Sequence, residues 1–567
     1  MKAKNTGLLA ALVMSVTANA STENPATFDW FEYRGSDPVF EQPLAKDEYR
    51  NPILAGYYPD PSIVQVEDDY YLVNSSFAHY PGIPIFHSRD LVNWTQLGHV
   101  IDRPDQVDFS GLGISRGIFA PAITYNEGTF YLVTTCVDCG GNFVVTAKNP
   151  AGPWSDPVWL PEVGGIDPSL FFDDDGKAYI INNDAPIGEP LYDGHRALWV
   201  QEFDAEKLAT IGPRKLVVNG GVNLADKPVW IEGPHLFRKD GQLYLIAAEG
   251  GTSVNHSQVV LKGESPFGPF TPWDKNPILT QRHLDPGRSN PVTSVGHADF
   301  VQDAEDNWWA VFLGIRPYEG DFYNTGRETF LMPVSWEDGW PVITRDEQLI
   351  PMVAKRPALP PQQPGPLPLT GNFAQRDEFD SPRLPMHWLQ LRNPSPEPWL
   401  SLERAPGSLQ LTPTATALAD IGNPAFVGRR QQHLHATAIT RMRYQPLREN
   451  DRAGMAVFQN REHFYFFGVT GNADGGTDLI VTRRDGAGEQ QSRTVARQAL
   501  ATRSGKHADI QLRVTARGAE YDFHYRLDSG KDWQPLLLAA DGKVVSTRQA
   551  GGFVGALIGL HAYRAEL

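Results

Sequence analysis

Cysteine is almost absent from this chain: its 567 residues include only Cys136 and Cys139. A zinc site needs about four ligands, which two cysteines do not supply. The C-x-x-C spacing also occurs in redox motifs, but here it ends a strand-like segment and no helical pattern follows it. We therefore expect no redox or metal chemistry from this pair, and either a disulfide that closes a tight loop or two inert thiols.

Positive charge is also scarce. Lysine and arginine total 50 against 67 aspartate and glutamate residues, which gives a formal net charge of −17. An acidic protein is poorly suited to nucleic acid or to anionic membranes. A neutral polymer remains a suitable partner, and the 14 Trp, 19 Tyr and 28 Phe residues fit stacking on sugar faces. β-Sheet proteins, however, carry many aromatic residues for packing alone.

Long apolar runs are missing beyond the N-terminus, and none approaches the roughly 20 residues of a transmembrane helix. Residues 1–20, MKAKNTGLLAALVMSVTANA, contain two lysines, an apolar run and a final Ala-Asn-Ala. This is the layout of a secretory signal peptide with cleavage after Ala20. We expect an exported protein, either periplasmic or extracellular.

Before residue 350 the sequence has no long stretch with the apolar periodicity of an amphipathic helix. It contains an internal repeat instead. Five segments share one layout of strand, polar hairpin and aromatic-rich strand: YPDPSIVQVEDDYYLV, FAPAITYNEGTFYLV, GIDPSLFFDDDGKAYII, IEGPHLFRKDGQLYLI and GHADFVQDAEDNWWAVF. Their first strands align on Ile63, Ile123, Leu170, Leu236 and Phe300. The anchors are irregularly spaced, at intervals close to the length of one propeller blade with insertions. The repeat therefore predicts an all-β fold, a five-bladed β-propeller over residues 21–355.

Three carboxylates fall at equivalent places in this repeat. Asp60 and Asp167 stand three residues before their anchors, and Glu232 stands four before. Asp60 lies between two prolines, so we expect an extended, rigidly held residue. If the first strands line a central channel, the three carboxylates meet in one pocket. Glycosidic cleavage needs such a set: a protonated acid for the leaving oxygen and an ionised carboxylate for water or direct attack.

The segments YPDPS, GIDPS and IEGPH resemble the catalytic signatures of glycoside hydrolase family 43, and the similarity runs from about residue 50 to residue 345. The resemblance implies an inverting mechanism. Asp60 would be the general base, Glu232 the general acid, and Asp167 would orient the acid and raise its pKa. Inversion requires room for water, so the base and acid carboxyls should lie roughly 6.5–9.5 Å apart.

Further positions follow from the same resemblance. His297 in GHAD is similar to an axial histidine beside a structural Ca²⁺ held mainly by water, and Arg327 in GRETF to an arginine that contacts the terminal sugar. Phe119 stands where many relatives have tryptophan, and Phe77 is a candidate wall of the sugar pocket. His256 is a further candidate for substrate contact. The chemistry itself requires no cofactor.

A proline-rich linker is predicted over residues 356–369, with six prolines between positions 357 and 368. Beyond it, residues 370–567 alternate or run apolar between turns, as in a β-sandwich. They resemble the lectin-like sandwich appended to family members of the xylosidase type, which can close one side of the pocket. Phe553 is the candidate aromatic inserted there.

These patterns predict an exo-acting glycosidase that releases xylose from non-reducing ends of xylo-oligosaccharides. An α-L-arabinofuranosidase, or one enzyme with both activities, is the alternative, acting on arabinosyl-decorated substrates. A non-catalytic sugar-binding propeller is the alternative from another class, although binding alone does not need three carboxylates. No nucleic acid or membrane partner is expected, and the sequence leaves the oligomeric state open.

Overall fold

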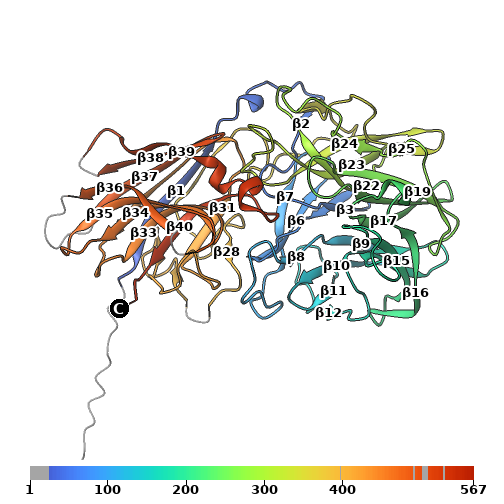
Figure 1. The fold of residues 1–567 in the computed structure, drawn as a ribbon, viewed down its shortest axis with the longest axis horizontal. Coiled ribbons are helices and arrows are strands. Elements are labelled where there is room, and N and C mark those ends of the chain that lie inside the picture. Colours follow the sequence, from blue (N-terminus) through green and yellow to red (C-terminus); the bar gives the residue numbers. More distant parts are fainter. Residues whose placement is uncertain (1–23, 396–397, 489–491, 501–507, 528–529, 567) are drawn as a thin grey trace, which may run out of the picture.

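The computed structural model describes residues 24–395, 398–488, 492–500, 508–527 and 530–566. The predicted export signal lies outside these residues. The chain forms two lobes that lie side by side (Figure 1). Both are built from β-strands, which confirms the predicted all-β class, and the described part has one short α-helix, α1 (Thr547–Ala550). No helix among the described residues is long and apolar enough to cross a membrane.

The larger lobe, here called the ring lobe, contains five successive antiparallel sheets in the described chain. The strands of these sheets, in chain order, are β3 (Ser62–Val66), β4 (Asp69–Val73), β6 (Gly82–Ser88), β7 (Thr95–Ile101); β8 (Gly117–Ile118), β9 (Ala122–Asn126), β10 (Thr129–Val137), β11 (Gly141–Ala147), β12 (Val158–Trp159); β13 (Ile166–Phe172), β14 (Ala178–Asp184), β15 (Ala197–Asp204), β16 (Ala209–Asn219); β17 (Glu232–Lys239), β18 (Gln242–Glu249), β19 (Ser257–Gly263), β20 (Phe270–Pro272), β21 (Leu279–Thr280); and β22 (Thr293–Gln302), β23 (Trp308–Ile315), β24 (Glu328–Glu337), β25 (Trp340–Val342).

The first strands of these sheets surround a common axis. Strands β3, β9, β13, β17 and β22 contact one another in succession, and β22 also contacts β3. Ser62 joins three sheets here: its hydroxyl donates to Asp299 of β22 at 2.7 Å and accepts the backbone N–H of Ile123 in β9 at 3.1 Å. A hydroxyl and a carboxylate thus fasten the last sheet to the first at the level where the strands begin.

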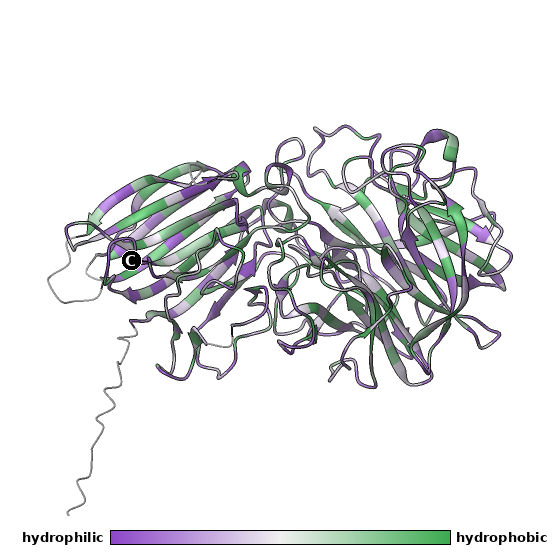
Figure 2. Ribbon diagram, turned by 60° about the horizontal axis from the view of Figure 1, so that its bottom comes forward, coloured by the Kyte–Doolittle hydropathy of each residue, from purple (hydrophilic) through white to green (hydrophobic). Residues whose placement is uncertain are grey.

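The smaller lobe, here called the sandwich lobe, packs two sheets around an apolar core. Hydrophobic and hydrophilic residues alternate along its strands (Figure 2), and His435–Tyr444 alternate between buried and more exposed positions. One sheet contains β29 (Leu400–Ser401), β30 (Leu409–Leu411), β1 (Ala26–Gly35), β32 (His435–Tyr444), β37 (Ala508–Arg517), β38 (Glu520–Leu527), β39 (Gln534–Asp541) and, beside β1, β27 (Ala374–Asp377). The other contains β31 (Phe426–Arg430), β40 (Leu557–Tyr563), β33 (Arg452–Asn460), β34 (His463–Gly471), β35 (Thr477–Asp485) and β36 (Ser492–Leu500).

Strand β1 corrects the predicted start of the first domain. We predicted that residues from position 21 onward belong to the propeller, but β1 pairs with β27, β30 and β32 of the sandwich lobe. Its buried Phe28, Phe31 and Tyr33 complete the core of that lobe. The chain therefore begins in the sandwich lobe, crosses to the ring lobe and returns, because apolar alternation in a strand does not reveal which sheet it joins.

The proline-rich segment is fastened to the ring lobe. Leu359 and Leu369 are buried in an apolar cluster with residues of the first and last ring sheets. Gln362 donates from its backbone N–H to Asp90 at 2.9 Å and from its side chain to the Asn93 carbonyl at 2.9 Å. Pairing of β2 (Glu48–Arg50) with β26 (Val353–Lys355) joins both ends of the ring lobe just before this segment.

The two lobes share a continuous apolar contact. One buried cluster combines Phe77, Ile114 and Ile118 of the ring lobe with Phe458 and Leu557 of the sandwich lobe. β5 (His79–Tyr80) of the ring lobe also pairs with β28 (Gln390–Leu391). Burial of this apolar surface holds the lobes together and fixes the sandwich lobe beside the ring axis.

Candidate active site

A left-handed backbone conformation recurs at one equivalent position in four sheets of the ring lobe, within or just before the first strand. Asp60, Asp167, Gly233 and His297 occupy equivalent positions and have φ angles of 50°, 54°, 55° and 52°. The left-handed region costs a non-glycine residue about 1–2 kcal/mol. Asp60 was expected to be extended because proline follows it, and this expectation is wrong. Register shifts at these places in β13, β17 and β22 turn the side chains toward the axis.

Asp60, Asp167 and His297 line one cavity of ≈ 440 Å³ at the ring axis. Asp60, Asp167 and Glu232 come from three different sheets and all face it. All three are buried, with 5% of each residue's surface exposed. The convergence of the carboxylates, predicted from their register, is therefore present in the structure.

Asp60 is surrounded by hydrogen-bond donors and positive charge. The Ser75 hydroxyl donates to its Oδ2 at 2.6 Å, and Nη1 of Arg327 donates to its Oδ1 at 3.2 Å. The Nδ1 of His297 lies 3.9 Å from the same Oδ1. Burial acts to raise the pKa of Asp60, but Arg327, His297 and Ser75 together hold it below its ordinary value. Asp60 is therefore the ionised carboxylate of the set.

Glu232 and Asp167 lie in the opposite electrostatic situation. Burial, together with the charges of Asp167 and Asp60, raises the pKa of Glu232 well above its ordinary value. Burial and the charge of Asp60 likewise raise the pKa of Asp167 to about 7, although the Gly233 backbone N–H donates to its Oδ2 at 3.2 Å. Glu232 is therefore the carboxyl that holds its proton more strongly, while the lowered pKa of Asp60 favours its ionised form.

Three phenylalanines form one wall of the cavity. The ring of Phe553, from the sandwich lobe, stacks on Phe77 with centroids 5.8 Å apart, and meets Phe119 edge-on at 5.6 Å. Phe77 and Phe119 are in edge contact at 5.3 Å. The Phe553 backbone N–H donates to the Ser115 hydroxyl at 2.9 Å. The sandwich lobe thus closes one side of the cavity with an anchored aromatic ring.

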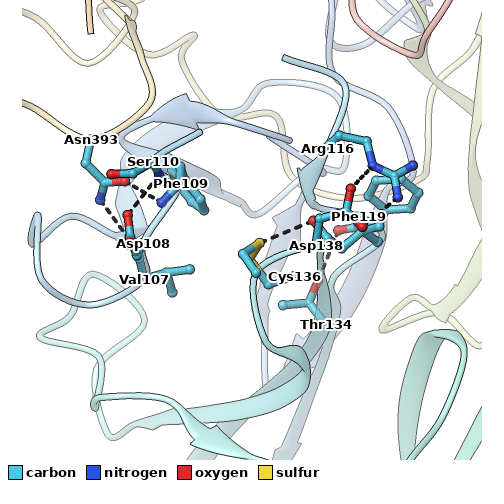
Figure 3. Close-up of a disulfide and its surroundings, with 12 residues drawn as sticks. Val107, Asp108, Phe109, Ser110, Arg116, Phe119, Thr134, Cys136, Asp138 and Asn393 are labelled. Carbon is cyan, nitrogen blue, oxygen red and sulfur yellow. Dashed lines mark hydrogen bonds and ion pairs between the residues drawn. A yellow bond between two sulfur atoms is a disulfide. The ribbon is translucent and has the colours of Figure 1, made fainter. Parts of the chain in front are cut away.

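A disulfide loop supports the adjoining part of this wall. Cys136 and Cys139 are joined, and Asp138 between them accepts two hydrogen bonds from Arg116, at 2.7 and 3.0 Å (Figure 3). Arg116 lines the cavity and its guanidinium lies 5.9 Å from the Phe119 ring. Of the two outcomes left open by the sequence, the structure shows the disulfide, placed behind residues of the cavity wall.

Of the three remaining predicted site residues, two line the cavity and one lies behind its wall. Arg327 and His297 line the cavity, and the Arg327 guanidinium lies 5.2 Å from the Phe553 ring. His256 does not line it: its ring lies behind Gly296, and its Nδ1 is 3.0 Å from the Ser294 carbonyl oxygen. The direct substrate contact predicted for His256 is therefore wrong, because its loop places the ring in the second layer.

Sequence reasoning missed two conspicuous members of the cavity, Arg116 and Trp230. Trp230 stands two residues before Glu232, and the Arg196 guanidinium lies 4.8 Å from its ring. Its nearness to the IEGPH motif was the available signal. Arg116 offered no comparable signal, because its place depends on the pairing of β8 with β10 and on the disulfide loop.

The residues around His297 do not form a calcium site by themselves. Ca²⁺ takes six to eight oxygen ligands, whereas His297 offers only ring nitrogens. Within the described ranges, no group of three or more His, Cys, Asp or Glu side chains is arranged to hold a metal ion. A narrow adjoining space is lined by His297, His235, Asp167, Ser169 and four prolines, and among the described residues only Asp167 and Ser169 offer it oxygen-bearing side chains.

Comparison with known proteins agrees with this chemistry. Residues 49–341 match the model of glycosyl hydrolases family 43, and residues 376–566 match the β-xylosidase C-terminal concanavalin A-like domain. A xylosidase/arabinosidase of Butyrivibrio fibrisolvens is 39% identical over 526 residues, covering 90% of this chain and 95% of the relative. A non-reducing end α-L-arabinofuranosidase of Bacteroides ovatus is 36% identical, covering 92% of each chain.

Solved structures extend the similarity. A GH43_12 protein retrieved from a capybara gut metagenome superimposes with a TM-score of 0.87 at 42% sequence identity. The match covers 95% of this chain and 100% of that chain. A xylan β-1,4-xylosidase from Bacillus halodurans gives 0.81 at 32% identity, covering 91% and 96%. The chain belongs to glycoside hydrolase family 43 and is a glycoside hydrolase with a C-terminal concanavalin A-like domain.

Proposed function

We propose that this protein is an exo-acting, inverting β-xylosidase that removes xylose from non-reducing ends of xylo-oligosaccharides. One observation carries the proposal: a single cavity holds a buried carboxylate with a lowered pKa, Asp60, and a buried carboxyl with a raised pKa, Glu232. In the fold that goes with this proposal, the five sheets of the ring lobe are the blades of a five-bladed propeller.

In this mechanism Asp60 accepts a proton from the attacking water, and Glu232 donates its proton to the oxygen of the leaving sugar. Both transfers occur in one displacement, so the configuration at the anomeric carbon inverts. Asp167 lies in the same cavity, and its ionised form adds to burial in raising the pKa of Glu232, which favours the protonated acid before reaction. Arg327 and Ser75 keep Asp60 ionised between turnovers.

The two sugars are placed by the roles of the carboxylates. The leaving sugar lies beside its proton donor, Glu232, and the terminal sugar lies beside Asp60 and Arg327, which line the same cavity. Because Phe553 closes one side of this cavity, we expect it to accept a chain terminus, which favours exo action.

An α-L-arabinofuranosidase activity, alone or beside xylosidase activity, is the second candidate. The Bacteroides ovatus relative with 36% identity is named for that activity, and the Butyrivibrio relative for both. Both candidates use the same carboxylates and differ in the terminal sugar. Export, with action on oligosaccharides outside the cytoplasm, completes the proposal.

Matched substrates separate the candidates. We expect 4-nitrophenyl β-D-xylopyranoside to be hydrolysed with a higher kcat/KM than 4-nitrophenyl α-L-arabinofuranoside, and xylobiose to yield xylose. A reversed preference would favour the arabinofuranosidase. Absence of hydrolysis of either compound and of xylobiose would overturn the proposal and favour a sugar-binding protein.

A further inference from the structure

A second cavity lies in the sandwich lobe, on the outer face of the sheet formed by β31, β40, β33, β34, β35 and β36. It measures ≈ 240 Å³ and shares no lining residue with the candidate active site. Its lining includes two arginines, one histidine and several aromatic and hydroxyl side chains, chiefly Arg452, Phe466, Thr482, Arg493, His561 and Tyr563.

Two glycines allow close strand pairing beside His561, which lines this cavity. Gly454 pairs with Gly468 on one side and with His561 on the other, so the three positions share the outer face. A Cβ atom on Gly454 would lie 2.2 Å from the Phe467 carbonyl oxygen, and one on Gly468 would lie 2.2 Å from that of Ala453. A side chain at either position would therefore clash with the backbone of the neighbouring strand.

The charge of the cavity is one-sided. Among the residues that the structure describes, no aspartate or glutamate lines it, although the whole chain has a net charge of −17. Arg452 makes no ion pair within the described residues; its guanidinium lies 4.7 Å from the Tyr563 ring and 5.7 Å from Phe466. Arg493 stands at the exposed edge, 3.5 Å from Asp485. Since a partly desolvated cation favours an ionic partner, Arg452 suits an incoming anion.

His561 adds a hydrogen-bond acceptor. It is buried, with 2% of its surface exposed, and its Nδ1 lies 3.0 Å from the Ala425 carbonyl oxygen. This contact requires an N–H on Nδ1, so in the neutral ring Nε2 carries a lone pair. Among the described residues, Nε2 makes no hydrogen bond. A ligand that satisfies it must bring a donor, such as a hydroxyl.

This cavity is therefore lined by three kinds of group. They are the Arg452 guanidinium without an anion, Nε2 of His561 without a hydrogen-bond donor, and the aromatic rings of Phe466 and Tyr563. We propose that this cavity is a second carbohydrate site, which binds a uronate: an acidic sugar whose carboxylate pairs with Arg452. A sugar hydroxyl donates to Nε2 of His561, and the C–H face of the ring packs on Phe466 or Tyr563. A neutral sugar leaves Arg452 without an anionic partner, and a simple anion leaves Nε2 of His561 without a hydrogen-bond donor.

Two ligands that differ mainly in a carboxylate test the proposal. We would titrate the protein with D-glucuronate, D-glucose and inorganic phosphate by calorimetry. D-Glucuronate is expected to bind about tenfold or more tightly than either of the others, since a hydrogen bond to a charged group contributes about 1.5–3 kcal/mol. Arg452→Gln should remove this preference. Arg497→Gln, on β36 but outside the cavity lining, is the matched control and should retain it.

Other readouts keep the test decisive. Should Arg452→Gln fail to fold, Thr482→Val removes a lining hydroxyl and should weaken D-glucuronate binding severalfold. Equal binding of glucose, equal binding of phosphate, or unchanged binding by the folded Arg452 and Thr482 variants would each overturn the proposal. So would competitive inhibition of xyloside hydrolysis by D-glucuronate at its binding concentration, because that would place it in the active-site cavity beside Arg327.

Discussion

The ring of Phe553 lies stacked on that of Phe77, with centroids 5.8 Å apart and planes inclined by 21°. The two residues come from different lobes, and the contact stands at the wall of the cavity that holds the three carboxylates. The sandwich lobe is therefore part of the candidate active site and contributes one aromatic side chain to it. The shape of this cavity wall therefore depends on how the two lobes pack together.

Phe553→Ala should lower kcat/KM for xylobiose roughly 2- to 12-fold, because an aromatic contact contributes about 0.5–1.5 kcal/mol. The lower kcat/KM should result from poorer substrate positioning, and the Tm of the variant should stay close to that of the wild type. Steady-state kinetics and a melting curve check this together. Phe270→Ala, in a ring-lobe strand outside the cavity lining, is the control. Equal kinetics for the two variants would contradict the role of the Phe553 wall.

The pH dependence of kcat/KM should follow the two opposite pKa shifts. Activity requires ionised Asp60 and is lost as pH falls through its lowered pKa; it also requires protonated Glu232 and is lost as pH rises through its raised pKa. Arg327 lowers the pKa of both groups. Arg327→Met should therefore shift both limbs of the profile to higher pH, whatever its effect on the maximum rate. An acid limb that stays in place would refute this assignment.

Loss of the Cys136–Cys139 disulfide should affect stability and the cavity wall together. The loop it closes is short, so chain-entropy arguments assign it about 2 kcal/mol. The double variant Cys136→Ser, Cys139→Ser should have a lower Tm and, because Asp138 holds Arg116, a higher KM for xylo-oligosaccharides. The wild type treated with reductant should behave similarly. If the double variant retains the wild-type KM, the loop does not position Arg116.

The stereochemical outcome tests the inverting assignment. Hydrolysis of a β-xyloside should first release α-xylose, because Asp60 activates water on the face opposite the leaving group. Proton NMR during the first minutes resolves the two anomers before mutarotation mixes them. Initial release of β-xylose would instead indicate retention and a covalent intermediate.

The repeat in the sequence was enough to predict much of this site. Asp60, Asp167 and Glu232 could be aligned because each first strand begins with the same short pattern, and the axis of the fold then brings them together. Residues outside the repeat were harder. The second-layer position of His256 depends on contacts that its loop makes with Gly296, and β1 joins the sandwich lobe through pairings with distant strands. The local sequence pattern around a residue does not indicate contacts with residues that are distant in the chain.

Paired substitutions at Asp60 and Glu232 test the central claim most directly. Xylobiose and 4-nitrophenyl β-D-xylopyranoside should be hydrolysed by wild type, Asp60→Asn and Glu232→Gln under identical conditions. The aryl leaving group needs little protonation, so Glu232→Gln should lose xylobiose cleavage by about 100-fold or more while it retains much of the aryl activity. Asp60→Asn should lose both activities, since water must be activated in either case. Wild-type turnover by the folded Asp60→Asn variant would contradict the account.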